Sequence, residues 1–69
     1  MQGEELVDRL TNTPNAEQIS RISEVRGAAL ALGAVILAHT PTTREQSLAI
    51  THLEETVMWA VMSIVLEEV

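Results

Sequence analysis

The sequence contains no cysteine, no tyrosine and no phenylalanine, and its only aromatic residue is Trp59. Without cysteine, no disulfide can stabilise the fold, and no cluster of metal-ligating residues replaces one, so we expect neither a metal nor another cofactor. A chain of 69 residues forms a single domain. Because so short a chain buries only about 60% of its unfolded surface, a monomer would be marginally stable, and oligomerisation is the remaining means of stabilisation.

Basic residues are scarce too. Four arginines face ten acidic residues, which gives a formal net charge of −6. A DNA or RNA polymer would meet net repulsion and no basic stripe, so we exclude such a partner. A small anion is a different case, because one or two well-placed arginines and a helix N-terminus can hold it.

Long apolar runs are also missing. The longest are residues 27–38 and, with Ser63 inside it, residues 57–66. Both fall short of the roughly 20 residues that span a bilayer. Residues 1–10 include three acids and lack the basic-then-apolar order of a signal peptide. We therefore expect no membrane partner, and the lack of cysteine is compatible with a reducing cytoplasm.

Two prolines punctuate the chain, and each precedes a segment that is typical of a helix. After Pro14, Asn15 and Gln18 have the spacing of a capping box, with Thr13 as an alternative cap. This predicts a helix at about residues 16–39. Residues 4–10 are expected to form a short leading helix or arm.

After Pro41, Thr42 as N-cap would place Glu45 at the third helical position, which is the second capping box. We predict a helix at about residues 43–68 behind it. The connection between the two long helices is only three or four residues, so they should lie antiparallel as neighbours.

Apolar residues recur at steps of three and four along both expected helices, and these stripes predict the seam of the hairpin. They comprise Ile22, Val25, Ala29, Leu32 and Ile36 in the first helix and Ile50, Leu53, Val57, Ala60 and Ile64 in the second. Many apolar residues remain outside the seam, namely Leu30, Leu37, Met58, Val61, Met62 and Val65. A two-helix hairpin cannot cover both faces, so we predict a single all-α domain over residues 1–69 that assembles as a homo-oligomer.

Small residues make the first long helix thin between positions 27 and 34. Glycine inside a helix costs about 0.5–1 kcal/mol relative to alanine, so Gly27 and Gly33 indicate that another backbone or a ligand comes close. Close helix packing and a ligand wall both explain them. Arg26, beside Gly27, is either a snorkelling or intersubunit-paired side chain or a phosphate contact at a subunit boundary.

A cation at Arg44, in the first turn of the second long helix, opposes the helix dipole. It is explained if it shares an anion with the free N–H groups of that turn and the hydroxyl of Thr42 or Thr43. The alternative is an exposed arginine in a surface salt bridge. Thr51 lies among apolar neighbours, and by default its hydroxyl bonds to the preceding turn.

Acidic pairs at residues 54–55 and 67–68 are interpreted as solvated faces. The sequence shows no set of nucleophile, base and orienting residue, and no glycine-rich phosphate loop after a strand. We therefore predict a binding protein and not an enzyme.

Three short patterns share one register between residues 41 and 61. They are Pro-x-x-Arg-Glu at 41–45, Ala-x-Thr-x-Leu-Glu at 49–54 and Met-Trp-Ala at 58–60. In these patterns the C-terminal half resembles the hairpin domain of the phage anti-CBASS and anti-Thoeris sponges, the Acb/Tad hairpin family. The first long helix resembles the family more loosely, through Arg26 before an Ala/Leu/Gly run and Pro14 twelve residues upstream.

The resemblance implies a homohexamer in the cytoplasm of an infected bacterial host, where it sequesters cyclic oligonucleotide second messengers without cleaving them. It implies a site for cyclic dinucleotides such as cGAMP between protomers, at Thr11, Asn12 and Arg26. It also implies a separate site for cyclic trinucleotides such as cyclic tri-AMP, for which Arg44 and Thr51 are candidates. Gly27 and Thr43 complete the candidate ligand-binding residues.

One departure from the family concerns a tyrosine that the resemblance leads us to expect near Thr11, where it would stack on a base. This chain has no tyrosine. Stacking on an aromatic side chain contributes about 1–3 kcal/mol per base, so the dinucleotide site would be weakened, rebuilt from other contacts or lost. In the last case the other pocket would be the active one.

Two other functions remain as alternatives. A small oligomeric protein–protein adaptor could use the spare apolar face to dock a host protein, with no nucleotide ligand. An RNA-binding helical hairpin is disfavoured by the acidic charge.

Overall fold

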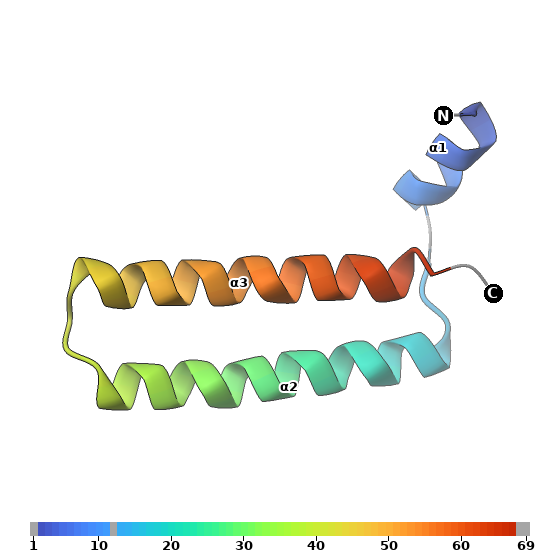
Figure 1. Cartoon of the computed structure of the whole chain (residues 1–69). Coiled ribbons are helices and arrows are strands. Elements are labelled where there is room, and N and C mark those ends of the chain that lie inside the picture. The colour runs from blue at the N-terminus through green and yellow to red at the C-terminus, as the bar shows by residue number, and fades with distance from the viewer. Residues whose placement is uncertain (1, 12, 68–69) are drawn as a thin grey trace.

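The computed structural model describes residues 2–11 and 13–67, without the side chains of residues 7–9 and 11. These residues form three helices: α1 (Gly3–Thr11), α2 (Ala16–His39) and α3 (Arg44–Val65). Figure 1 shows α2 and α3 side by side and antiparallel, with α1 projecting from the open end of the pair. The predicted all-α hairpin with a short N-terminal helix is therefore confirmed.

The start of α2 is fixed by the predicted capping box. The side chain of Asn15 accepts a hydrogen bond of 2.8 Å from the backbone N–H of Gln18. The backbone N–H of Asn15 in turn donates to Oε1 of Gln18 at 2.9 Å. At the other end, the backbone N–H of Thr40 bonds to the carbonyl of Ile36, and Pro41 follows, so α2 ends at His39.

The prediction that Thr42 caps the second long helix was wrong. Thr43 is the N-cap of α3, and its hydroxyl accepts a hydrogen bond of 3.2 Å from the backbone N–H of Gln46. The third helical position is therefore Gln46, whose side chain turns back to the backbone carbonyl and hydroxyl of Thr40. A single capping bond and this side-chain bridge replace the reciprocal box expected from Thr42 and Glu45.

The C-terminal end of α3 also differs from the prediction of about residue 68, since the helix ends at Val65. Glu67, interpreted as part of a solvated pair, is instead half-buried and bonded to Arg21 of α2 at 2.6 Å between Nη1 and Oε1. Together with Gln18, which also reaches Glu67, these residues form an open-end cluster (Gln18, Arg21 and Glu67) that ties the two helices together.

The seam between α2 and α3 follows the predicted stripes closely. Ile22 and Ile64 are buried, and the remaining stripe residues are half-buried, with one exception. Leu32 was predicted to lie in the seam but is 50% exposed. Gly33 lies there instead, because a Cβ atom built on it would meet Cδ2 of Leu53 at 3.5 Å.

Much apolar surface is left uncovered. Within the described residues, only Ile22, Ile64 and Gln18 are buried, whereas Leu30 is 77% and Trp59 66% exposed. By length and composition, α2 and α3 could each cross a membrane. No such span was expected from the sequence, because the uninterrupted apolar runs of both helices are shorter than about 20 residues. Because the core is so small, the main apolar faces of the hairpin are exposed.

Candidate functional site

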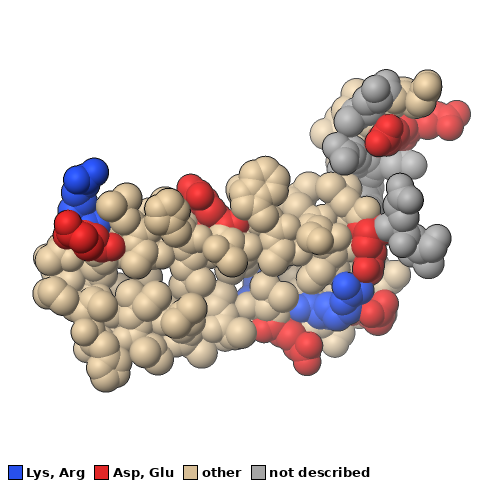
Figure 2. Space-filling model, viewed as in Figure 1, with Lys and Arg blue, Asp and Glu red and all other residues tan. Residues whose placement is uncertain are grey.

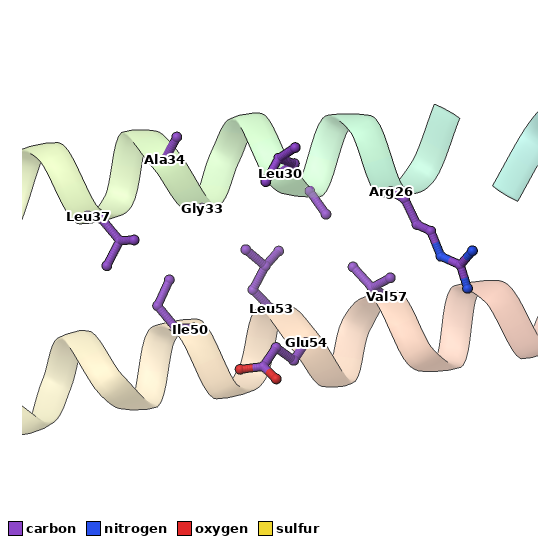
Figure 3. Close-up of a pocket in the computed structure, with 10 residues that line it drawn as sticks. Arg26, Leu30, Gly33, Ala34, Leu37, Ile50, Leu53, Glu54 and Val57 are labelled. Carbon is purple, nitrogen blue, oxygen red and sulfur yellow. The ribbon is translucent and has the colours of Figure 1, made fainter. Parts of the chain in front are cut away.

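A groove runs along one side of the hairpin, between α2 and α3 (Figure 3). It encloses about 560 Å³. Its walls are almost entirely apolar, and Arg26 and Glu54 are its two charged residues. The lining residues are Arg26, Ala29, Leu30, Gly33, Ala34, Leu37, Ile50, Leu53, Glu54 and Val57.

Arg26 is an exposed residue on α2, at the end of the groove that is nearer the open end of the hairpin. In Figure 3 its side chain extends past Val57 toward α3, whereas Glu54 points away from α2. Among the described residues that line the groove, it is the one cation. An apolar surface that ends in a single guanidinium suits a ligand with a flat apolar part and an anionic group, since arginine offers five N–H donors.

Gly27 follows Arg26 and is open. A Cβ atom built on it would meet nothing within 4 Å, so packing of α3 does not explain this glycine. Gly33, in contrast, faces α3, where a Cβ atom built on it would meet Cδ2 of Leu53 at 3.5 Å, an ordinary contact that alanine could also make. Packing among the described residues therefore requires glycine at neither position, and Gly27 in particular is open to a ligand or another chain.

Thr43, Arg44 and Thr51 lie at and beyond the loop that joins the helices. The hydroxyl of Thr43 already accepts the capping hydrogen bond of α3, and Arg44 is the exposed first residue of that helix. Thr51 is exposed and follows Arg44 by seven residues, which places both on the same face of α3 about 10 Å apart along its axis. A ligand could span them only by lying along this face.

One chain does not bring the two groups of candidates together. Arg26 precedes the end of α2 by thirteen residues, so about 20 Å of helix separates it from the loop beside Arg44. The side chain of Thr11 and all of Asn12, the other two candidates, lie outside the described residues. Within one chain the described candidates thus form two separate groups, each with one arginine.

The charged side chains, like the candidate residues, fall into two separate regions (Figure 2). Figure 2 shows a broad tan surface over the hairpin, with most Lys/Arg and Asp/Glu groups toward its two ends. Among the described residues, no group of three His, Asp or Glu side chains could hold a metal ion.

Sequence reasoning missed the structural part of two acids. Glu54 is exposed, as its interpretation as a solvated acid requires, but it also lines the groove. Glu67 was interpreted likewise but belongs to the open-end cluster. The position of Glu54 could have been found, since it is four residues after Ile50 and three before Val57. Nothing in the spacing pairs Glu67 with Arg21.

The fold and the site together define a small helical-hairpin domain that presents apolar faces and isolated arginines, as a binding module does. Residues 3–65 match the family described as the Acb2/Tad1 hairpin domain, and the chain belongs to this family. Membership indicates a phage anti-defence role as a cyclic-nucleotide sponge, with a binding domain and not a catalytic one. Searches of curated proteins and of solved structures gave no match.

Proposed function

We propose that this protein sequesters cyclic oligonucleotide second messengers in the cytoplasm of an infected bacterium and releases them unchanged. The ligands are cyclic dinucleotides of the cGAMP type, cyclic trinucleotides of the cyclic tri-AMP type, or both. Each pocket removes one messenger from the signalling pool, so that the effectors of a CBASS-type defence are deprived of it. The role is stoichiometric, in keeping with a family of binding domains.

The observation that carries the proposal is the position of Arg26 at the end of an apolar groove, in a chain of this family. A cyclic dinucleotide combines flat bases with phosphodiester anions. The apolar groove suits the bases, and the guanidinium suits a phosphate oxygen. Gly27 beside it leaves room for the ligand to approach the backbone.

The dinucleotide site is proposed to contain Thr11, Asn12, Arg26 and Gly27, and the trinucleotide site Thr43, Arg44 and Thr51. Each set is incomplete within one chain, so we place both sites at the borders between protomers of a homohexamer. The exposed apolar faces support this assembly, since Leu30 and Trp59 would otherwise face water.

Isothermal titration with 3′,3′-cGAMP, cyclic di-GMP and cyclic tri-AMP tests the proposal. Arg26→Ala should weaken dinucleotide binding and Arg44→Ala trinucleotide binding, each by about 10- to 150-fold, the value of a lost charge-assisted hydrogen bond. Ser20→Ala, an exposed change on α2, is the matched control and should bind as the unmodified chain does. Ligand recovered after denaturation should be intact.

Absence of heat with all three ligands would refute the sponge, and degraded ligand would indicate a nuclease. The exposed apolar surface also fits a protein–protein adaptor with no nucleotide ligand. The ligand-free mass separates the two, since the sponge predicts six chains of 7.5 kDa, whereas an adaptor predicts a monomer or dimer.

A further inference from the structure

Glu54 places a carboxylate in a groove that the proposed function gives to an anionic ligand. It lines the groove from α3, between Ile50 and Val57, and is exposed. Among the described residues, no hydrogen bond or ion pair engages Glu54, and none engages Arg26, the other charged residue of the groove. Because a carboxylate repels phosphate, Glu54 would weaken binding unless another part of the ligand attracts it.

The two charges lie on opposite walls of the groove. Arg26 extends from α2 past Val57, and Glu54 precedes Val57 by three residues, which is about 4.5 Å along α3 (Figure 3). Leu30 and Leu53 are level with Glu54 along the hairpin. The groove thus presents a cation, then an apolar wall with a carboxylate beside it. A nucleotide carries a phosphate, then a flat base with a polar edge.

The carboxylate lies where it can meet the edge of a base and not its face. In Figure 3 it points away from α2, so it stands at the rim of the groove. A base seated against Leu30, which is 77% exposed, would turn its outer edge toward this rim. The phosphate, at the other end of the nucleotide, would then lie nearer to Arg26 than to Glu54.

A carboxylate selects among bases because it only accepts hydrogen bonds. The Watson–Crick edge of guanine presents two neighbouring donors, N1–H and the N2 amino group, which match the two oxygens of a carboxylate. The same edge of adenine presents one donor, the N6 amino group, beside the lone pair of N1, which faces a carboxylate oxygen unfavourably. A site built for two donors therefore rejects a base that offers one donor and one acceptor.

We propose that Glu54 is a specificity-determining residue of this groove and that it selects cyclic dinucleotides that contain guanine over those that contain only adenine. The inference rests on the proposed function and deepens it, since it names the base that the groove prefers. The carboxylate accepts N1–H and N2–H of one guanine, while the guanidinium of Arg26 donates to a phosphodiester oxygen.

A contact of Glu54 with the sugar is the competing explanation. The 2′-hydroxyl of a ribose can also donate to a carboxylate. Cyclic di-GMP and cyclic di-AMP have the same ring of ribose and phosphate, so a sugar contact contributes equally to both affinities. A base contact contributes to one affinity only, and the ratio of the two affinities therefore separates the explanations.

Isothermal titration with cyclic di-GMP, cyclic di-IMP and cyclic di-AMP tests the contact on the unmodified chain. Cyclic di-GMP should bind about 5- to 150-fold more tightly than cyclic di-AMP, which is the discrimination expected of one bidentate pair. Cyclic di-IMP keeps N1–H but lacks the N2 amino group, so its affinity should fall between the other two.

Glu54→Gln should remove this preference. A glutamine amide offers one donor and one acceptor, which match the edge of adenine and no longer match both donors of guanine. The preference for cyclic di-GMP over cyclic di-AMP should fall by about fivefold or more. Glu55→Gln is the matched control, because this exposed neighbour loses the same charge but does not line the groove, and it should leave the preference unchanged.

Equal affinities for the three dinucleotides would overturn the guanine contact and leave the sponge standing. So would a preference that Glu54→Gln does not change, or an equal loss of affinity for every dinucleotide, which would place the carboxylate against the ribose. If cyclic tri-AMP alone gives heat, the sponge again stands and the guanine contact is refuted. Absence of heat with all four ligands would refute the sponge, and this inference with it.

Discussion

The side-chain amide of Gln18 donates a hydrogen bond of 2.9 Å from Nε2 to the backbone carbonyl of Ile64, across the open end of the hairpin. Oε1 of the same amide accepts the backbone N–H of Asn15 and so completes the capping box of α2. Gln18 is only 5% exposed. One buried amide thus joins the first turn of α2 to the last turn of α3, where carbonyl groups lack their regular intrahelical partners.

Among substitutions of polar residues, replacing Gln18 should be one of those that lower the stability of the fold most. Gln18→Ala removes half of the capping box and the bond to Ile64, so we expect the free energy of unfolding to fall by about 1–3 kcal/mol. Urea denaturation followed by far-UV circular dichroism measures it. Gln46→Ala is the matched control, because its bonds to Thr40 are exposed and should contribute less than about 0.5 kcal/mol. Equal losses would contradict the structure.

The open-end cluster also predicts a pH dependence. Hydrogen bonds from Arg21 and then from Gln18 lower the pKa of Glu67 below its ordinary value. The folded state therefore favours the ionised carboxyl. Its contribution to stability is present above the unfolded pKa of about 4.3 and is lost as the pH falls through the lower pKa of the folded state.

Glu67→Gln should accordingly lower the Tm at pH 7, and its difference from the unmodified chain should close at acid pH. Thermal unfolding by circular dichroism at a series of pH values checks this. Glu24→Gln, an exposed change on α2, serves as the control and should change the Tm little at neutral pH. A constant difference between Glu67→Gln and the unmodified chain down to strongly acid pH would show that the ion pair does not stabilise the fold.

Local patterns were enough to predict the helices, since periodicity and caps act within a few residues. The spacing of Asn15 and Gln18 predicted the capping box that the structure contains. It failed at the next helix because Thr42 and Thr43 are adjacent and are each followed at the third position by a suitable residue, Glu45 or Gln46. In the structure the N-cap is Thr43, one residue after the predicted Thr42, and no sequence rule distinguishes the two threonines.

Features that join distant segments were beyond such patterns. The ion pair of Arg21 and Glu67 spans 46 residues, and the groove exists only where α2 and α3 flank each other. The sequence marked Arg26 and Gly27 as exceptions in a thin helix, and the structure places Arg26 at the end of an apolar groove.

Membrane insertion is the alternative that α2 and α3 raise by length and composition. Glu54 and Glu55 lie in the middle of α3, where a charged group at the centre of a bilayer costs about 2.5–3.5 kcal/mol. We expect the chain to stay with the lipid-free fraction when floated with phosphatidylcholine vesicles. A Glu54→Leu/Glu55→Leu variant should shift toward the vesicles, and co-flotation of the unmodified chain would contradict the expectation.

The two glycines of α2 offer a last test, because their surroundings differ. Beside Gly33 a methyl group would only touch Leu53, and beside Gly27 it would meet none of the described residues within 4 Å. Within a single hairpin, alanine at either position should stabilise the helix by about 0.5–1 kcal/mol. Any harm from Gly27→Ala must therefore come from a ligand or a second protomer.

We expect Gly27→Ala to weaken cyclic-dinucleotide affinity by about tenfold or more, since an added methyl group against a bound ligand costs about 1–3 kcal/mol. Gly33→Ala should raise the Tm and leave the affinity unchanged. Calorimetric titration and thermal unfolding of the ligand-free variants separate the two effects. If Gly27→Ala binds as tightly as the unmodified chain, the ligand does not approach this turn of α2, and the site at Arg26 must face another way.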